Sequence, residues 1–184
     1  MEFFDTSTTN LLAAAQKAGV NHLVALSVVG TEYLAGQSGY FEAKLRQEQL
    51  IGAGPIPYSI VHATQFFEFL NTIADSATVG DTVSLPPALF QPMASVDVAE
   101  GVTIAAVGDP TNAITEIGGP EAVRLPDLIR TALTARGDAR QVVADPAAAY
   151  WGIQIQERTL VPGDGATLFE TRFEDWILET AAKA

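Results

Sequence analysis

Two apolar runs constrain the fold of this chain more than any other feature. Residues 22–29 read His-Leu-Val-Ala-Leu-Ser-Val-Val, a nearly continuous apolar run that predicts a strand covered on both faces, as in a parallel sheet. Residues 58–63, Tyr-Ser-Ile-Val-His-Ala, predict the next strand. The segment 40–51 between them has apolar side chains at helical spacing. Strand, helix and strand in this order predict a right-handed βαβ unit and an α/β fold.

The remainder of the chain divides near residue 76, where the pattern of elements changes. Before this point we expect further helices at residues 7–18 and after Thr64, so that residues 1–76 form part of an α/β sheet domain. After it, residues 77–184 predict a smaller, mixed α/β region that caps the first. Its expected strands are 82–85, 89–93, 113–117 and 140–143, and its expected helices are 96–106, 125–135, 147–156 and 173–182.

The composition excludes several classes of function. Of the 184 residues, 48% are hydrophobic and 17% charged, which is typical of a folded domain and not of a disordered chain. The net charge of −12 repels phosphate backbones and anionic lipids, so we expect no nucleic-acid or membrane partner. The chain has no cysteine and two histidines, so we expect no disulfide, no thiolate chemistry and no histidine-rich metal site. The acidic N-terminus does not resemble a signal peptide, and we expect a cytoplasmic protein.

One group of polar residues follows the first predicted strand and can carry chemistry. Ser27 closes that strand, and Tyr40 and Lys44 stand one turn apart on the helix after it. An ammonium beside a phenol lowers the pKa of the phenol and prepares it for proton transfer. Ser27 would lie where open α/β sheets bind ligands, at the carboxyl end of a strand. The alternative is that the spacing arises by chance and Tyr40 is an ordinary surface residue.

These residues belong to longer segments that resemble a known family. The segments Leu23-Val-Ala-Leu-Ser-Val-Val-Gly30, Gly39-Tyr-Phe-Glu-Ala-Lys44 and Ile60-Val-His-Ala-Thr-Gln-Phe-Phe-Glu-Phe69 resemble atypical short-chain dehydrogenases/reductases, in particular their NmrA-like, NAD(P)H-binding branch. The resemblance covers essentially the whole chain. It implies a partial Rossmann-like parallel sheet with flanking helices, in which residues 1–76 are the C-terminal half of an NAD(P)-binding domain and residues 77–184 bind substrate.

The resemblance also implies a role for individual residues. Ser27, Tyr40 and Lys44 would be catalytic and would contact the cofactor, together with His62, Ala63, Thr64 and Gln65; Phe66 and Phe67 would lie near the substrate. The implied cofactor is NAD(P)H, with a slight lean toward NADP, and the implied substrate is a small carbonyl or quinone-type molecule. His62 stands where relatives commonly have arginine, and it reads equally well as a hydrogen-bonded strand residue. Phe4 falls near a position where many relatives have an asparagine that supports proton relay.

The N-terminal segment of the sequence departs from the family pattern. Relatives begin with a strand and a Gly-x-x-Gly-x-x-Gly turn that holds the pyrophosphate, and this sequence has no such turn. We therefore expect a truncated chain, a late-start reading frame or one part of a split protein. The sheet should then have an exposed apolar edge or face, which predicts a homo-oligomer.

Three functional hypotheses remain at this point. The first is an NAD(P)H-dependent oxidoreductase in which Tyr40 delivers a proton, Lys44 tunes Tyr40 and Ser27 orients the substrate oxygen. The second is a non-catalytic, NmrA-like dinucleotide sensor that regulates a partner protein. The third is a fragment with no activity of its own.

Overall fold

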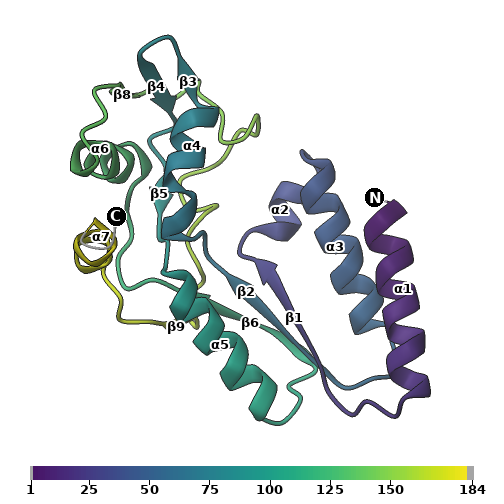
Figure 1. Cartoon of the computed structure of the whole chain (residues 1–184). Coiled ribbons are helices and arrows are strands. Elements are labelled where there is room, and N and C mark those ends of the chain that lie inside the picture. The colour runs from purple at the N-terminus through teal and green to yellow at the C-terminus, as the bar shows by residue number, and fades with distance from the viewer. Residues whose placement is uncertain (1, 182–184) are drawn as a thin grey trace.

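A parallel sheet built from strands on both sides of residue 76 organises the molecule (Figure 1). The computed structural model describes residues 2–181, and within them this sheet has four strands. The strands β1 (Leu23–Val28), β2 (Tyr58–Ala63), β6 (Ala113–Gly118) and β9 (Thr167–Leu168) lie in the order β1-β2-β6-β9, and every neighbouring pair is parallel. This confirms the α/β class and both strands predicted from the apolar runs.

Helices cover the sheet from both sides. Helices α1 (Glu2–Lys17) and α3 (Gly39–Gly52) lie side by side, and α5 (Ser95–Val107) lies across the sheet from them (Figure 1). Val98 of α5 packs with Val61, Ala63, Met93 and Ile117 in a small apolar core. The α5 backbone comes so close to β6 that a Cβ at Gly101 would lie 2.6 Å from the Ile117 side chain, which would have to move to admit it.

The rest of the chain adds short strands and further helices. Strands β3 (Thr78–Val79), β4 (Thr82–Leu85) and β8 (Gln141–Ala144) form one sheet, and β5 (Leu89–Phe90) pairs with β7 (Val123–Arg124). The helices here are α4 (Leu70–Ser76), α6 (Leu125–Ala135) and α7 (Phe173–Ala181).

The main apolar core draws on both parts of the chain. It joins Leu34 and Phe41, which precede the predicted boundary near residue 76, to Phe90, Leu125 and Ile129, which follow it. All of these side chains are buried, and Leu34, Phe90, Leu125 and Ile129 are fully so. A single core therefore spans that boundary.

Two local predictions were wrong, and burial or backbone geometry explains both. Residues 31–35, where the sequence predicted no helix, form helix α2 (Thr31–Ala35), because Thr31 donates to the carbonyl of Val28 and Leu34 is buried in the main core. Residues 147–156, expected as a helix, instead contain a tight turn, because two backbone hydrogen bonds between Tyr150 and Ile153 override the local helical preference.

The predictions near Thr64 and at the C-terminal end need a smaller adjustment. The helix expected after Thr64 begins as a 3₁₀ turn at Phe67–Phe69 and continues as α4. The last residue of the helix expected at 173–182 lies outside the described residues.

Within residues 2–181, no helix is both long enough and apolar enough to span a lipid bilayer.

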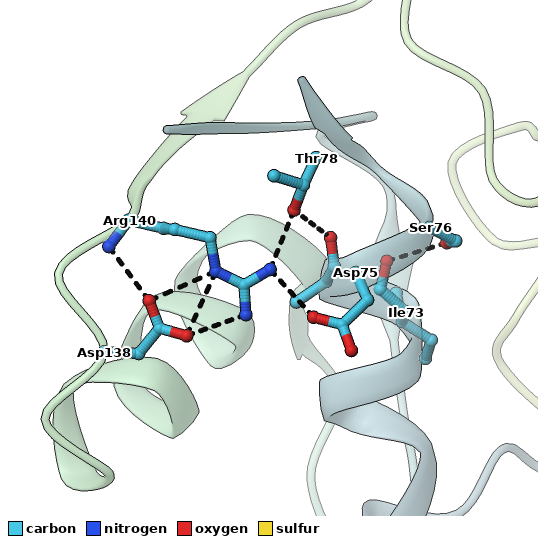
Figure 2. Close-up of polar contacts among 7 residues, drawn as sticks. Ile73, Asp75, Ser76, Thr78, Asp138 and Arg140 are labelled. Atoms are coloured by element: carbon cyan, nitrogen blue, oxygen red, sulfur yellow. Dashed lines mark hydrogen bonds and ion pairs between the residues drawn. The ribbon is translucent and has the colours of Figure 1, made fainter. Parts of the chain in front are cut away.

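Arg140 ties the small sheet to the helices beside it (Figure 2). Its guanidinium donates to Asp138 at 2.7 Å, to Asp75 at 2.8 Å and to the hydroxyl of Thr78 at 2.9 Å. The hydrogen bonds to Asp138 and Asp75 raise the pKa of Arg140, and the same guanidinium lowers the pKa of Asp138. The Arg140 side chain is only 22% exposed, so these contacts are less screened by water than a surface ion pair.

We predict that Arg140→Met lowers the urea midpoint of unfolding, because three polar partners lose their donor. Arg46→Met is the matched control and should lower it less, because Arg46 pairs with Asp5 where both side chains are nearly half exposed. Urea unfolding of both variants measures the difference. Equal effects of the two substitutions would contradict this role for Arg140.

Candidate functional site

A cavity of about 410 Å³ opens at the carboxyl ends of β1 and β2. Open parallel sheets bind their ligands at this end of the strands. The residues that form most of its wall come from both parts of the chain: Val28, Tyr40, Gln65, Phe69, Tyr150 and Trp151. No residue that lines it, among those the structure describes, carries a formal charge. The cavity is therefore apolar, aromatic and placed where the fold favours binding.

Tyr40 is the predicted catalytic residue that reaches this cavity. It is the second residue of α3 and is 54% exposed. Its ring packs edge-on against Phe4 and Phe41, with centroids 6.5 and 5.2 Å away. Partial burial raises the pKa of Tyr40 above its ordinary value. The expectation that a neighbouring ammonium would lower this pKa was wrong, and the phenol is a protonated acid at neutral pH.

Lys44 shares a helix face with Tyr40, but its ammonium is hydrogen-bonded to other residues. The Lys44 Nζ donates to the carbonyl of Leu26 at 2.9 Å and to Gln47 Oε1 at 2.7 Å. Burial lowers the pKa of Lys44, while the charge of Glu48 opposes that shift. Lys44 lines a second cavity, of about 240 Å³, between α1 and β1. The structure therefore does not bring Lys44 into the wall of the Tyr40 cavity.

Phe4 is a neighbour of both side chains. Its ring packs edge-on to Tyr40, with centroids 6.5 Å apart, and the Lys44 ammonium stands 5.9 Å from its centroid. A phenylalanine has no group that passes a proton. A relay through this position is therefore not available to Tyr40.

Lys44 also protects the edge of the sheet. β1 is the outermost strand of its sheet in the described residues, and Leu26 is 39% exposed. An unpaired strand edge attracts other strands, and lysines commonly blunt it. Here the Lys44 ammonium donates a hydrogen bond to the carbonyl of Leu26, and the Thr31 hydroxyl donates one to the carbonyl of Val28. The edge expected from the sequence is present, but it is partly capped; self-association through it stays a prediction.

The Ser27 hydroxyl is hydrogen-bonded to a buried carboxylate. This hydroxyl donates to Glu48 Oε1, and His62 Nε2 lies 3.1 Å from the same oxygen. All three residues are at most 6% exposed, and the other oxygen, Glu48 Oε2, has no partner among the described residues. A hydroxyl has one hydrogen to donate, so Ser27 cannot donate to a substrate while it holds this bond. His62 is a buried, hydrogen-bonded strand residue in this arrangement.

Glu48 was missed by the sequence analysis, although a signal was present. The buried positions of α3 include Phe41, Lys44, Glu48 and Ile51, which follow one another at intervals of three or four residues. A charged residue on such a face needs a partner inside the protein, because burying a charge alone is costly. The polar residues on the two neighbouring strands, Ser27 and His62, supply it.

We predict that Glu48→Ala lowers the free energy of unfolding by about 3 kcal/mol, because it leaves Ser27 and His62 buried without their shared acceptor. Urea unfolding followed by circular dichroism measures the loss. Glu42→Ala, at an exposed position of the same helix, is the control and should change little. A loss below about 1 kcal/mol for Glu48→Ala would contradict the buried bridge.

The residues after β2 divide between the cavity and the core. Ala63 is buried at the end of β2, and the buried Thr64 hydroxyl has no partner among the described residues. Gln65 lines the Tyr40 cavity, and neither its amide nitrogen nor its amide oxygen has a hydrogen-bond partner there. A buried polar group without a partner costs about 1–3 kcal/mol, and of these two residues only Gln65 lines the cavity.

The two phenylalanines predicted near the substrate do not line this cavity. Phe67 is 2% exposed, packs against Phe173 and Trp176, and lines a separate cavity of about 200 Å³. Phe66 is half-buried and packs on Phe69, with centroids 5.6 Å apart. Phe69 is the member of this cluster that lines the Tyr40 cavity, because the chain makes a 3₁₀ turn there before α4 begins.

A tight turn carries Trp151 to the cavity. Tyr150 and Ile153 exchange backbone hydrogen bonds of 2.9 and 3.0 Å, and the two residues between them have positive φ, 51° at Trp151 and 79° at Gly152. Two positive φ values are what a two-residue hairpin turn requires. Tyr150 is buried, and burial raises its pKa well above the ordinary value.

This burial predicts a loss of stability at alkaline pH. The unfolded chain ionises Tyr150 at about pH 10, whereas the folded chain keeps it protonated, so stability falls as pH rises above about 10. The slope from this one group is at most about 1.4 kcal/mol per pH unit. Urea midpoints measured on both sides of about pH 10 should fall less steeply for Tyr150→Phe than for the wild type. Tyr33→Phe, at an exposed site, should keep the wild-type slope; if Tyr150→Phe keeps it too, the assignment is wrong.

Comparison with known proteins supports the fold. No family model matches the sequence, and no curated protein matches it. Solved structures do match: TunA, described as an NAD-dependent NDP-hexosamine 5,6-dehydratase, has a TM-score of 0.66 and 15% identity over 98% of this chain and 70% of its own. WbmG of Bordetella bronchiseptica, solved with NAD, has a TM-score of 0.65 and 15% identity over 95% of this chain and 62% of its own.

A short-chain dehydrogenase/reductase superfamily protein from Agrobacterium tumefaciens, solved with bound NAD, matches similarly, with a TM-score of 0.65 and 16% identity over 98% of this chain and 71% of its own. The chain thus spans between 62% and 71% of the length of these three neighbours. The chain therefore has the Rossmann-like α/β fold that these neighbours share. Identities this low establish the fold and leave the activity to the site itself.

Proposed function

We propose that this chain carries the substrate-reducing site of an NAD(P)H-dependent oxidoreductase. The observation that carries the proposal is Tyr40, a protonated phenol at the wall of an uncharged cavity beside the carboxyl ends of two parallel strands. The bound nicotinamide would supply a hydride to the carbon of a carbonyl or quinone-type substrate. Tyr40 donates the proton to the substrate oxygen. Because Tyr40 is half exposed, water returns the proton directly and no relay is needed.

The residues after β2 fit the nicotinamide end of the cofactor. Gln65 lines the cavity, and its amide, unpaired within the described residues, has both a donor and an acceptor that a turn of the side chain would present to the cofactor. A nicotinamide carboxamide needs both kinds of partner. The aromatic side chains around the cavity offer apolar surface on which the nicotinamide and substrate rings would pack.

We predict that Tyr40→Phe lowers the rate of NAD(P)H oxidation with 2-methyl-1,4-naphthoquinone by about 100-fold or more, because the proton donor is lost. The decrease of NAD(P)H absorbance measures the rate. Tyr33→Phe, at another exposed tyrosine outside the cavity wall, should leave it unchanged. An unchanged rate in Tyr40→Phe would remove Tyr40 from the mechanism.

A second candidate is a dinucleotide sensor without turnover. Two observations favour it: the Ser27 hydroxyl is bonded to Glu48, and the Lys44 ammonium is bonded to the carbonyl of Leu26. Neither group then assists Tyr40. Saturable binding of NADH or NADPH without any quinone or aldehyde turnover would favour the sensor over the reductase.

A further inference from the structure

We propose that the cavity between α1 and β1 binds a monocarboxylate with a short apolar chain, whose carboxylate pairs with the Lys44 ammonium. This cavity has a volume of about 240 Å³, and none of the described residues that line it also lines the Tyr40 cavity. The inference therefore does not depend on the proposed function. It follows from the walls of the cavity, its single cation and the unpaired edge of β1.

The walls of the cavity are mainly apolar. Helix α1 contributes Phe4, Leu11 and Leu12, and Ile51 of α3 lines the same space. A hydrocarbon chain gains free energy in proportion to the apolar surface that it removes from water. A dry cavity of about 150 Å³ holds benzene, so this larger cavity suits a chain of about six carbons.

Lys44 is the only charged residue among the described residues that line this cavity. Its ammonium donates to two neutral acceptors, the Leu26 carbonyl and Gln47 Oε1, and an ammonium has a third hydrogen to donate. Lys44 is 7% exposed, and burial lowers its pKa. The charge of Glu48 offsets only part of that shift, and its carboxylate is hydrogen-bonded to Ser27. The carboxylate of a ligand would supply the anion that a buried cation needs.

The outer edge of β1 adds backbone donors to the site. The N–H groups of Leu23 and Val29 donate to carbonyls of β2 and of the residue before it. Because alternate residues of a parallel strand bond to the same neighbour, the N–H groups of Val24 and Leu26 point away from β2. Val24 and Leu26 both line the cavity, and β1 is the outermost strand among the described residues. The site is therefore rich in donors and suits an acceptor-only group such as a carboxylate.

The charge of the site selects a single negative charge. A diphosphate would bring more negative charge than one ammonium balances, and an amine would meet Lys44 with like charge. The net charge of −12 disfavours anions at long range, but salt screens that repulsion beyond about 10 Å. None of the described lining residues is acidic. The Thr8 hydroxyl lies in the wall without a partner, but it is out of contact with water, so we assign it no role in binding.

Calorimetry on the purified chain without cofactor tests the inference with hexanoate, hexanamide and hexylamine. We expect saturable binding of hexanoate, binding of hexanamide that is about tenfold weaker, and no binding of hexylamine. Lys44→Met should weaken hexanoate about tenfold and bring its affinity level with that of hexanamide, because the cation is lost. Lys17→Met, at an exposed lysine of α1, is the matched control and should leave the hexanoate affinity unchanged.

Leu12→Trp provides a second variant in case circular dichroism shows that Lys44→Met does not fold. Its larger side chain fills part of the cavity, so it should weaken hexanoate and hexanamide alike. Absence of hexanoate binding to the wild type, equal affinities for hexanoate and hexanamide, or an unchanged hexanoate affinity in a folded Lys44→Met or in Leu12→Trp would each overturn the inference. A dimer in light scattering that forms through β1 and excludes hexanoate would overturn it as well.

Discussion

The arrangement of the site depends on one buried carboxylate. The carboxylate of Glu48 on α3 accepts a hydrogen bond from the Ser27 hydroxyl on β1. The same oxygen, Glu48 Oε1, lies 3.1 Å from His62 Nε2 on β2. This fixes α3 against the two strands whose ends form the cavity, and so fixes Tyr40 at the start of the same helix. A charge so deeply buried is tolerated only where polar partners surround it. The bridge that places Tyr40 also occupies the hydroxyl of Ser27.

The three side chains predicted to act together are therefore divided. Tyr40 faces the cavity, Ser27 is bonded to Glu48, and Lys44 caps the carbonyl of Leu26 at the edge of β1. Partial burial raises the pKa of the Tyr40 phenol, which suits the role of a proton donor. A site of this kind fits reduction better than the reverse reaction, which needs Tyr40 as a base.

Strands with apolar runs could be predicted from the sequence, whereas contacts between distant residues could not. Residues 22–29 and 58–63 contain no Asp, Glu, Lys or Arg, so their place in a parallel sheet was visible without tertiary information. Helix α2 was not visible, because it is stabilised by burial of Leu34 in a core built mainly from later residues. The spacing of Tyr40 and Lys44 placed them correctly on one helix face. Lys44 nevertheless donates a hydrogen bond to the Leu26 carbonyl of β1. No neighbouring strand uses this carbonyl, because β1 is the edge strand among the described residues.

The claim that this chain serves nicotinamide-dependent reduction is tested most directly by cofactor binding. NADH and NADPH are titrated separately into the purified chain while nicotinamide fluorescence is followed. The account predicts saturable binding of at least one of them, retained in Tyr40→Phe because that substitution removes only the hydroxyl. No binding of either cofactor at high micromolar concentration would contradict the account.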